Sequence, residues 1–486
     1  IVPSEGLCLI FTSLASSQRL MCYYDSMAEK RPAHGQFSIS NIDPNLCTHL
    51  AYAFADINEN KIVPANVEDV QQYIDFNALK ESNPQLKTML AVGGLTFRTQ
   101  KFSSMVQTKE NRAEFIDSVV KLLRTAKFDG LNLDWRYPGG AGSEPQDKQR
   151  FTELCKELKN AFEADGIARG EDRLILSASV SAERAIIDAS YEVEQIAEHL
   201  DFINVLTFDF HGPWENVTGH HSPLYTGPQD TGDNIYSNAD SAMSYWRDQG
   251  APAEKLNMGI GFYGRAFTLA SDSTAVGAPA KGPAEEGCYT GEEGFWATYE
   301  TCLYTEGVEI QRISDQKVPY AITENQWVGF DDTDSLEAKA NYLNEKGYGG
   351  AFVWSVDLDD FKGEFCKQGK NPFIRQLHDL LVPGFPQSTT TATTTTTTTP
   401  TTTPTTTPTT TTTAPTTTTR KPTTTTTTTK SASAGFLCGN RSGRFADPND
   451  ETMYYSCDGN GNTGHHLPCP PTLVFNTGCS CCNFKR

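Results

Sequence analysis

The chain has 486 residues, of which 60 are acidic and 40 basic, and its formal net charge is −20. This length allows one large globular domain and at least one small one, while the acidic excess disfavours nucleic acid and anionic membranes as partners and allows neutral polysaccharide. No apolar run approaches the roughly 20 residues that span a bilayer, so we expect no membrane anchor.

The first segment, residues 1–17, resembles the second half of a secretory signal peptide. An apolar stretch at 6–14 is followed by three small residues at 15–17, as at a signal cleavage site. A buried first strand is the alternative. Removal of a signal would take Cys8 with it, and secretion to the extracellular space would make the other cysteines candidates for disulfides.

Residues 18–385 show short apolar runs that alternate with helical patterns, which is typical of parallel β/α units. Eight runs predict an α/β fold, a (β/α)8 TIM barrel. The predicted strands are Leu20–Tyr24, His49–Phe54, Lys87–Gly93, Gly130–Asp134, Leu174–Val180, Phe202–Phe208, Leu256–Gly261 and Gly350–Trp354. Extra chain at about 268–326 predicts an inserted α+β subdomain that walls one side of a cleft.

One of the predicted helices covers 146–162, where four apolar residues repeat on one face. Cys155 lies beside this stripe. We interpret it as a small core residue rather than a nucleophile, because an unactivated cysteine behaves as a small apolar side chain.

Composition changes sharply after the barrel. Residues 386–434 are dominated by Thr with periodic Pro, which indicates an extended, mucin-like linker suited to O-glycosylation. Residues 435–486 are too few to form a good core without disulfides, and we expect a small disulfide-rich β module. Six cysteines allow fifteen pairings, among which the sequence does not choose, and a zinc site is the alternative. They are Cys438, Cys457, Cys469, Cys479, Cys481 and Cys482.

The run 128–139, FDGLNLDWRYPG, ends a predicted strand, where TIM barrels place their active sites. It resembles the fourth-strand signature of family 18 glycoside hydrolases, D-G-x-D-x-D-W-E-Y-P, whose last acid is the proton donor. Other strand ends extend this resemblance over about Leu20 to Leu381, and it is closest to animal acidic chitinases and their lectin-like relatives. These matches are Cys47–Leu50, Tyr52–Phe54, Gly93-Gly94, Phe208-Asp209 with Trp214, Tyr263–Arg265 and Trp354. The C-terminal module resembles their peritrophin-type chitin-binding domain.

The resemblance implies substrate-assisted catalysis, in which the 2-acetamido oxygen of chitin is the nucleophile. The enzyme protonates the leaving oxygen with a carboxylic acid and orients the acetamido group with carboxylates and a tyrosine hydroxyl. Strand alternation puts positions 132, 134 and 136 on one face. The family's catalytic positions are occupied here by Asp129, Asn132, Asp134, Arg136, Phe208 and Asp209.

Arg136 stands where the family has its acid. Arginine donates no proton near neutral pH because its pKa exceeds ~12, and its charge opposes the cation that forms during the reaction. Further departures are Phe208 for the family's sixth-strand tyrosine, Leu95-Thr96 for a Trp-Asn pair, and Met27 for a first-loop tryptophan. We therefore predict that no catalytic site is intact and that hydrolysis is slight or absent.

The remaining cleft positions can still bind sugar, because a flat aromatic face such as that of Trp354 suits the apolar face of a pyranose. The resemblance implies chitin binding by Tyr23, Phe54, Gly93, Gly94, Leu95, Thr96, Tyr137, Leu206, Trp214, Tyr263, Arg265 and Trp354, and by Tyr454 and Tyr455 in the small module. Phe475 is either core or contact. The tether raises the effective concentration of the second site. The resemblance also implies the disulfides Cys22–Cys47 and Cys302–Cys366, which leaves Cys288 over.

We thus expect a secreted monomer that binds chitin or N-acetylglucosamine oligosaccharides, with no cofactor, no metal site, and no nucleic acid or membrane partner. Two other functions stay open. One is an endochitinase with slow activity through Asp134, Asp209 or an outside acid. The other is a mucin-like structural protein of a matrix, in which the Thr-rich tract matters most.

Overall fold

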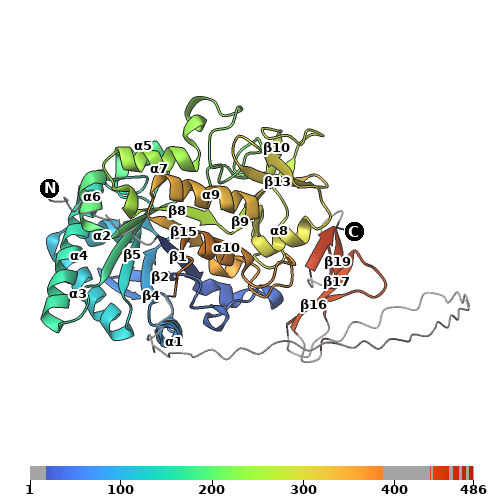
Figure 1. Ribbon diagram of the computed structural model, residues 1–486. Helices are drawn as coiled ribbons and strands as arrows, with labels where there is room; N and C mark the ends of the chain where they lie inside the picture. Colours follow the sequence, from blue (N-terminus) through green and yellow to red (C-terminus); the bar gives the residue numbers. More distant parts are fainter. Residues whose placement is uncertain are drawn as a thin grey trace, which may run out of the picture.

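A computed structural model of the protein describes residues 18–386, 438, 442–458, 464–469, 473–477 and 481–484. Its centre is a closed barrel of parallel strands, in which β1 pairs with both β2 and β15 and each other barrel strand pairs with its neighbours (Figure 1). The barrel strands are β1 (Arg19–Asp25), β2 (His49–Asn58), β4 (Lys87–Gly93), β5 (Gly130–Asp134), β6 (Ile175–Val180), β7 (Phe202–Val205), β8 (Leu256–Gly261) and β15 (Gly350–Trp354). The predicted TIM barrel is confirmed. A short strand, β3 (Lys61–Pro64), adds antiparallel to β2.

Helices surround the barrel and bury one face each against it (Figure 1). They are α1 (Asp69–Ser82), α2 (Thr99–Val106), α3 (Lys109–Ala126), α4 (Asp147–Arg169), α5 (Arg184–Ser190), α6 (Val193–His199), α7 (Ala239–Asp248), α9 (Thr333–Lys346) and α10 (Pro372–Leu381). The helix predicted over 146–162 is the first part of α4, which continues to Gly170, a left-handed cap at φ 67°. Cys155 is fully buried, which confirms its place in the core.

One strand prediction needs correction, and one is confirmed. β7 ends at Val205 rather than Phe208, and the Thr207 N–H donates to the Val205 carbonyl at 2.8 Å rather than to a neighbouring strand. β5 covers Gly130–Asp134 as predicted. Position 136 lies two residues beyond this strand, and its side chain contacts that of Asp134.

The inserted subdomain is an antiparallel sheet with one short helix, as predicted, and it runs from β9 to β14. Its strands are ordered β10-β9-β14-β13-β12, and β11 pairs with β9. The elements are β9 (Tyr263–Leu269), β10 (Ala280–Pro283), β11 (Phe295–Ala297), α8 (Thr298–Tyr304), β12 (Gln311–Ile313), β13 (Val318–Thr323) and β14 (Gln326–Gly329). Since β9 follows β8 almost directly, the insertion begins at the carboxyl end of a barrel strand.

The C-terminal module contains two small antiparallel sheets. Their strands are β16 (Ser442–Ala446), β17 (Met453–Asp458), β18 (His465–Pro468), β19 (Leu473–Asn476) and β20 (Cys481–Phe484). Cys438 and Cys457 form a disulfide and Cys469 is also disulfide-bonded, as expected. Cys479 and the side chains of Cys481 and Cys482 lie outside the described residues, as do the signal-like segment 1–17 and the Thr-rich tract from 387 to 437.

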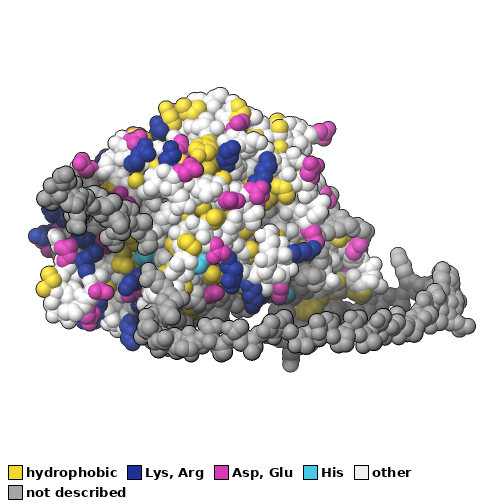
Figure 2. Space-filling view, in the orientation of Figure 1, with side chains coloured by type: hydrophobic (Ala, Val, Ile, Leu, Met, Phe, Trp, Pro, Cys, Tyr) yellow, Lys and Arg dark blue, Asp and Glu magenta, His cyan; other side chains and the backbone are white. Residues whose placement is uncertain are grey.

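The surface shown in Figure 2 mixes acidic and basic side chains with scattered apolar ones. Over the ranges of chain described above, no helix has the length and apolar character needed to cross a membrane.

Candidate functional site

A cavity of about 610 Å3 lies at the carboxyl ends of the barrel strands. This is the end at which TIM barrels hold their active sites, and the volume falls in the range of small-molecule sites. The predicted site residues that line it are Phe54, Leu95, Thr96, Arg136, Phe208, Asp209, Tyr263, Arg265 and Trp354. The loop 286–292 of the inserted subdomain forms a further part of the wall, as the prediction of a cleft wall requires.

Two aromatic rings form a flat surface in this cavity. Phe54 and Trp354 stack with their ring centroids 5.6 Å apart and their planes 20° from parallel. Tyr23, which is 1% exposed, packs under Trp354 with a centroid distance of 5.5 Å. Such a surface matches the apolar face of a sugar ring.

Gly93 and Gly94 shape the cavity through their backbone. Both have positive φ, and a Cβ on Gly93 would lie 2.0 Å from the Asp134 carbonyl oxygen. A Cβ on Gly94 would lie 2.7 Å from the Phe54 ring. The two glycines therefore allow β4 to approach both β5 and the aromatic surface.

Arg136 and Asp134 form a bidentate ion pair at the cavity. The guanidinium Nε donates to Asp134 Oδ1 at 2.7 Å and Nη2 donates to Oδ2 at 3.1 Å. The Asp134 side chain is 2% exposed and that of Arg136 is 15% exposed. Burial acts to lower the pKa of Arg136, but the Asp134 charge and its hydrogen bonds raise it above the ordinary value. Arg136 is therefore a permanent cation.

Asn132 lies behind this pair in a buried polar network. Its amide nitrogen donates to Ser177 Oγ at 3.0 Å, and its oxygen accepts from Tyr23 at 2.9 Å and Ser179 at 3.2 Å. Burial and the nearby Asp134 charge raise the pKa of Tyr23. Asn132 is thus a neutral hydrogen-bonded core residue at a position where the family signature has a carboxylate.

A second bidentate pair joins Asp209 to Arg265. Nε donates to Oδ1 at 2.8 Å and Nη2 to Oδ2 at 3.1 Å. The Arg265 guanidinium also lies 5.2 to 5.4 Å from the centroids of Tyr263, Phe295 and Trp214. Cation–π contacts of this kind hold a guanidinium in place, so Arg265 fixes the loop that carries Asp209.

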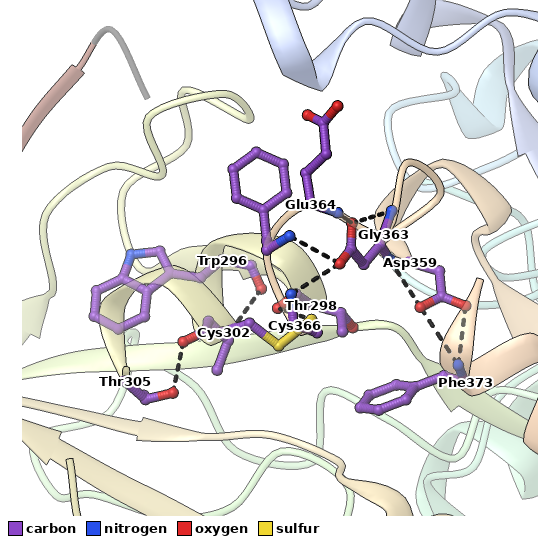
Figure 3. The surroundings of a disulfide bond; sticks show 12 residues. Trp296, Thr298, Cys302, Thr305, Asp359, Gly363, Glu364, Cys366 and Phe373 are labelled. Carbon is purple, nitrogen blue, oxygen red and sulfur yellow. Dashed lines mark hydrogen bonds between the residues drawn. A yellow bond between two sulfur atoms is a disulfide. The ribbon is translucent and has the colours of Figure 1, made fainter. Parts of the chain in front are cut away.

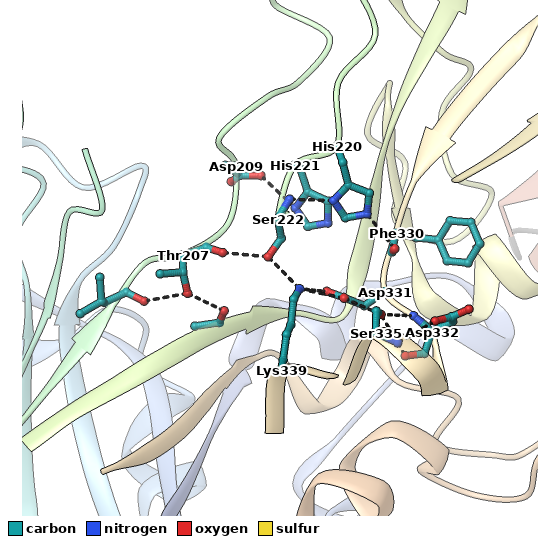
Figure 4. Close-up of polar contacts among 12 residues, drawn as sticks. Thr207, Asp209, His220, His221, Ser222, Phe330, Asp331, Asp332, Ser335 and Lys339 are labelled. Atoms are coloured by element: carbon teal, nitrogen blue, oxygen red, sulfur yellow. Dashed lines mark hydrogen bonds and ion pairs between the residues drawn. The ribbon is translucent and has the colours of Figure 1, made fainter. Parts of the chain in front are cut away.

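A buried ion pair supports the same loop from below (Figure 4). Lys339 Nζ donates to both Asp331 oxygens at 2.7 Å and to Ser222 Oγ at 3.0 Å, and Ser222 in turn donates to the Thr207 carbonyl at 2.8 Å. Lys339 and Asp331 are 0% and 1% exposed. Burial lowers the pKa of the adjacent His220 to about 3, so it is neutral. No sequence pattern pointed to this network.

The wall loop 286–292 is held by Glu300 on α8. This buried carboxylate accepts backbone N–H groups of Tyr289 at 2.7 Å, Thr290 at 2.9 Å and Ala297 at 2.8 Å. Desolvation by burial raises the pKa of Glu300. Glu300 was also missed by sequence reasoning.

The helix α8 is itself fixed by the disulfide Cys302–Cys366 (Figure 3). Next to it, Asp360 accepts the backbone N–H groups of residues 363–366 at 2.8 to 3.1 Å. This disulfide and Cys22–Cys47 are both present as predicted.

Other predicted positions lie away from the cavity lining. Asp129 is at the opposite end of β5, where it accepts from Lys80 Nζ at 2.9 Å and the Thr88 N–H at 2.7 Å, so its contacts are structural. Leu206 is 6% exposed and Tyr137 packs on the barrel core, whereas Trp214 is 60% exposed.

The aromatic residues of the C-terminal module fall into two stacked pairs. Phe475 is 7% exposed and stacks on Tyr454 at 5.4 Å, which places it in the core of the module. Tyr455 stacks on His466 at 4.5 Å, and His466 Nε2 contacts Asp447 Oδ2 at 2.7 Å. His466 is therefore a candidate ligand contact on the surface of the module, and no sequence pattern indicated it.

The closed barrel with its inserted sheet and aromatic cleft defines the class of the protein. Residues 19–359 match the Glycosyl hydrolases family 18, and the chain belongs to that family. It is a chitinase or a chitinase-like protein.

The relatives of this chain include both a chitotriosidase and a chitinase-like protein. The chain is 42% identical to mouse chitotriosidase-1 over 478 residues, covering 98% of this chain and 97% of the relative. It is 45% identical to human chitinase-3-like protein 2 over 369 residues, covering 76% and 93%. The first match extends through the C-terminal module.

Similar solved structures also include both a pseudo-chitinase and a chitinase. Human YKL-39, described as a pseudo-chitinase with retained chitooligosaccharide binding properties, has a TM-score of 0.73 and 45% identity over 75% of this chain and 100% of its own. The Group IV chitinase of Ostrinia furnacalis in complex with allosamidin has a TM-score of 0.72 and 36% identity over 76% and 99%. Family membership alone thus does not decide whether a chain hydrolyses chitin.

Proposed function

We propose that the protein is a secreted chitinase-like lectin that binds chitooligosaccharides in its barrel cleft and does not hydrolyse them efficiently. The observation that carries the proposal is the bidentate Arg136–Asp134 pair. Arg136 occupies the position of the general acid, so that acid is absent. Its guanidinium also engages both oxygens of Asp134, the neighbouring carboxylate that would orient the acetamido group. General acid catalysis contributes ~10²–10⁴-fold, so this single position is enough to suppress turnover.

An active chitinase would need another proton donor in the cavity. Both carboxylate oxygens of Asp209 accept hydrogen bonds from Arg265, so Asp209 is not the best candidate for this donor. Burial and the charge of Asp357 raise the pKa of Asp25 to about 6, which makes Asp25 the competing candidate. Its carboxylate also lies 3.8 Å from Arg31 and accepts the Met27 N–H at 3.0 Å. An Asp25→Asn variant tests directly for any turnover by this route.

Sugar binding is supported by the Phe54–Trp354 surface and by the likeness to the YKL-39 structure described as retaining chitooligosaccharide binding. Secretion is supported by the disulfides, which form and persist outside the cytosol. Tyr455 and His466 give the C-terminal module an aromatic surface for polymeric chitin.

The test is calorimetric titration of the purified full chain with the N-acetylglucosamine tetramer, beside an assay of product release. We expect measurable binding, no turnover, and a loss of affinity of about tenfold in Trp354→Ala, because stacking contributes ~0.5–1.5 kcal/mol beyond the apolar area that it buries and about 1.4 kcal/mol corresponds to tenfold. Ile167→Ala, on the outer face of α4 and 84% exposed, is the control and should bind normally.

Two results would overturn the proposal. One is the absence of binding by the folded natural chain. The other is turnover at an ordinary enzymatic rate, about 1–10³ per second. If Asp25→Asn abolished that turnover, Asp25 would be the proton donor and the protein a chitinase.

A further inference from the structure

The tripeptide Asn216-Val217-Thr218 follows the cleft loop after β7 and does not line the cavity. Asparagine followed by any residue except proline, and then by serine or threonine, is the acceptor pattern for N-linked glycosylation of secreted proteins. The pattern also occurs by chance, so its place in the fold decides whether it can carry a glycan. A second copy, Asn440-Arg441-Ser442, begins outside the described residues.

The segment 216–218 is fixed against the inserted subdomain. The Ala280 N–H donates to the Asn216 carbonyl at 2.8 Å, and the Thr218 N–H donates to the Ala278 carbonyl at 2.9 Å. Thr218 is 2% exposed, and its hydroxyl donates to the Ala275 carbonyl at 3.0 Å and accepts the Ala278 N–H at 3.1 Å. Thr218 therefore has a structural role that is independent of any glycan.

The side chain of Asn216 has no such role. It is exposed, and no residue in the described part of the chain forms a hydrogen bond with it. The bond from Ala280 uses only the backbone carbonyl of Asn216 and leaves the side-chain amide open to covalent attachment. A rigid backbone with an exposed asparagine amide is a position that can bear a bulky, hydrated group without disturbing the core.

Two exposed apolar side chains flank Asn216. Trp214 is 60% exposed and Val217 is 46% exposed. The indole packs on Gly212, where an added Cβ would lie 2.2 Å from the ring, and the Arg265 guanidinium lies 5.4 Å from the ring centroid. Arg265 lines the cavity, so Trp214 stands at the rim of the cleft. Exposed apolar surface of this kind commonly marks a place that another group covers, and a glycan is a cover that keeps the surface soluble.

We propose that Asn216 carries an N-linked glycan that covers Trp214 at the rim of the cleft. The donor is an oligosaccharide joined through its first N-acetylglucosamine to a lipid diphosphate. The bond from Asn216 Nδ2 to C1 of that sugar forms, and the bond from C1 to the diphosphate oxygen breaks. One amide hydrogen leaves as a proton, and the lipid diphosphate is the leaving group, so no oxidant or reductant is needed. This inference rests on the secretion included in the proposed function, but not on sugar binding in the cleft.

The first measurement maps the modification on the full chain, exported from cultured animal cells behind a standard secretion leader. Peptide-N-glycosidase converts a glycosylated asparagine to aspartate. Mass spectrometry should therefore find a glycan on the Asn216 peptide before this treatment and aspartate at that position after it. Thr218→Ser keeps both the acceptor pattern and the buried hydroxyl and should keep the glycan, whereas Asn216→Gln removes it. An unmodified Asn216 in the exported natural chain would overturn the proposal.

The second measurement tests whether the glycan covers Trp214. Brief exposure to hydroxyl radicals, followed by mass spectrometry, measures the oxidation of each tryptophan in the folded chain. Oxidation of Trp214 should rise about twofold or more in Asn216→Gln, because the bulky glycan no longer excludes the radical, while Trp354 should be unchanged. Asn440→Gln is the matched control, since it removes the other acceptor pattern and should leave Trp214 oxidation as it is. Equal oxidation of Trp214 with and without the Asn216 glycan would refute the covering role.

These outcomes are distinguishable from those of the proposed function. If Asn216→Gln is not exported, enzymatic removal of the glycan from the folded natural chain provides the same comparison. Neither measurement uses a chitooligosaccharide, so an unmodified Asn216 removes only this inference. A natural chain that does not bind the tetramer in calorimetry removes the proposed function and leaves the glycan at Asn216 in place.

Discussion

Replacing Arg136 by glutamate and Asn132 by aspartate should turn the protein into a working hydrolase. The first change supplies the acid and releases both oxygens of Asp134 from the guanidinium. The second restores a carboxylate behind them. The site of Asn132 accepts this change, because its oxygen already receives two hydroxyl hydrogen bonds and the Ser177 hydroxyl can turn from acceptor to donor.

The expected gain follows from the role of the acid. General acid catalysis contributes ~10²–10⁴-fold, which corresponds to about 3 to 5 kcal/mol of activation free energy at 1.36 kcal/mol for each tenfold change. Removal of the guanidinium adds to this gain, because a cation no longer faces the developing positive charge. Phe208 still lacks the tyrosine hydroxyl, and one missing transition-state donor costs ~10²–10³-fold, so the double variant should remain slower than an ordinary enzyme.

The assay is hydrolysis of a fluorogenic chitooligosaccharide by purified full chains. Arg136→Gln combined with Asn132→Asp is the matched control, because it removes the cation without supplying an acid, and it should stay inert. The double variant should exceed this control by at least ~10²-fold. Equal rates in the two variants, with both folded and able to bind the tetramer, would show that position 136 does not limit catalysis.

Three further predictions concern stability and the small module. Replacing Cys302 and Cys366 by serine removes a cross-link with a sequence separation of 64 residues, so it should cost about 4 kcal/mol and lower the melting temperature measured by calorimetry. Burial raises the pKa of Asp359 to about 7 from 3.8, so the folded state binds its proton more tightly and stability falls as pH rises from about 4 to 7. Asp359→Asn should lose less stability than the natural chain over that range in denaturant titrations, and parallel curves would contradict the reasoning. Tyr455→Ala should weaken sedimentation with insoluble chitin several-fold and leave tetramer binding unchanged, with His466→Ala acting in the same direction.

The barrel could be predicted because its strands are buried on both faces and read as short apolar runs. Their ends were less certain where an apolar run continues past the sheet. At Phe202–Phe208 the residues Leu206 and Phe208 are still apolar, and only the backbone bond from the Thr207 N–H to the Val205 carbonyl shows that the strand has ended. Apolar periodicity along one strand does not reveal where its backbone stops pairing with the neighbouring strands.

The residues at the mouth of the barrel were predictable because the motifs of the family lie at the ends of its strands. The residues that contact and support them were not predictable from the sequence. Asp134 is two residues from Arg136, yet the pairing depends on how the chain turns after β5. Lys339 and Ser222 are 117 positions apart, and Glu300 fixes its loop through backbone N–H groups that carry no sequence signal. The supports of the site therefore became visible only in the folded chain.

Arg136 affects the cleft in two ways that a change to a neutral residue would separate. It cannot release a proton near neutral pH, and its ion pair also engages both oxygens of Asp134. Arg136→Gln ends the second effect but not the first, so it should restore an acceptor for the acetamido N–H without restoring turnover. We expect the cleft of that variant to bind the tetramer through Asp134 and Trp354 together. Tetramer binding without turnover in Arg136→Gln would support this separation of the two effects, and a loss of all binding by the folded variant would contradict it.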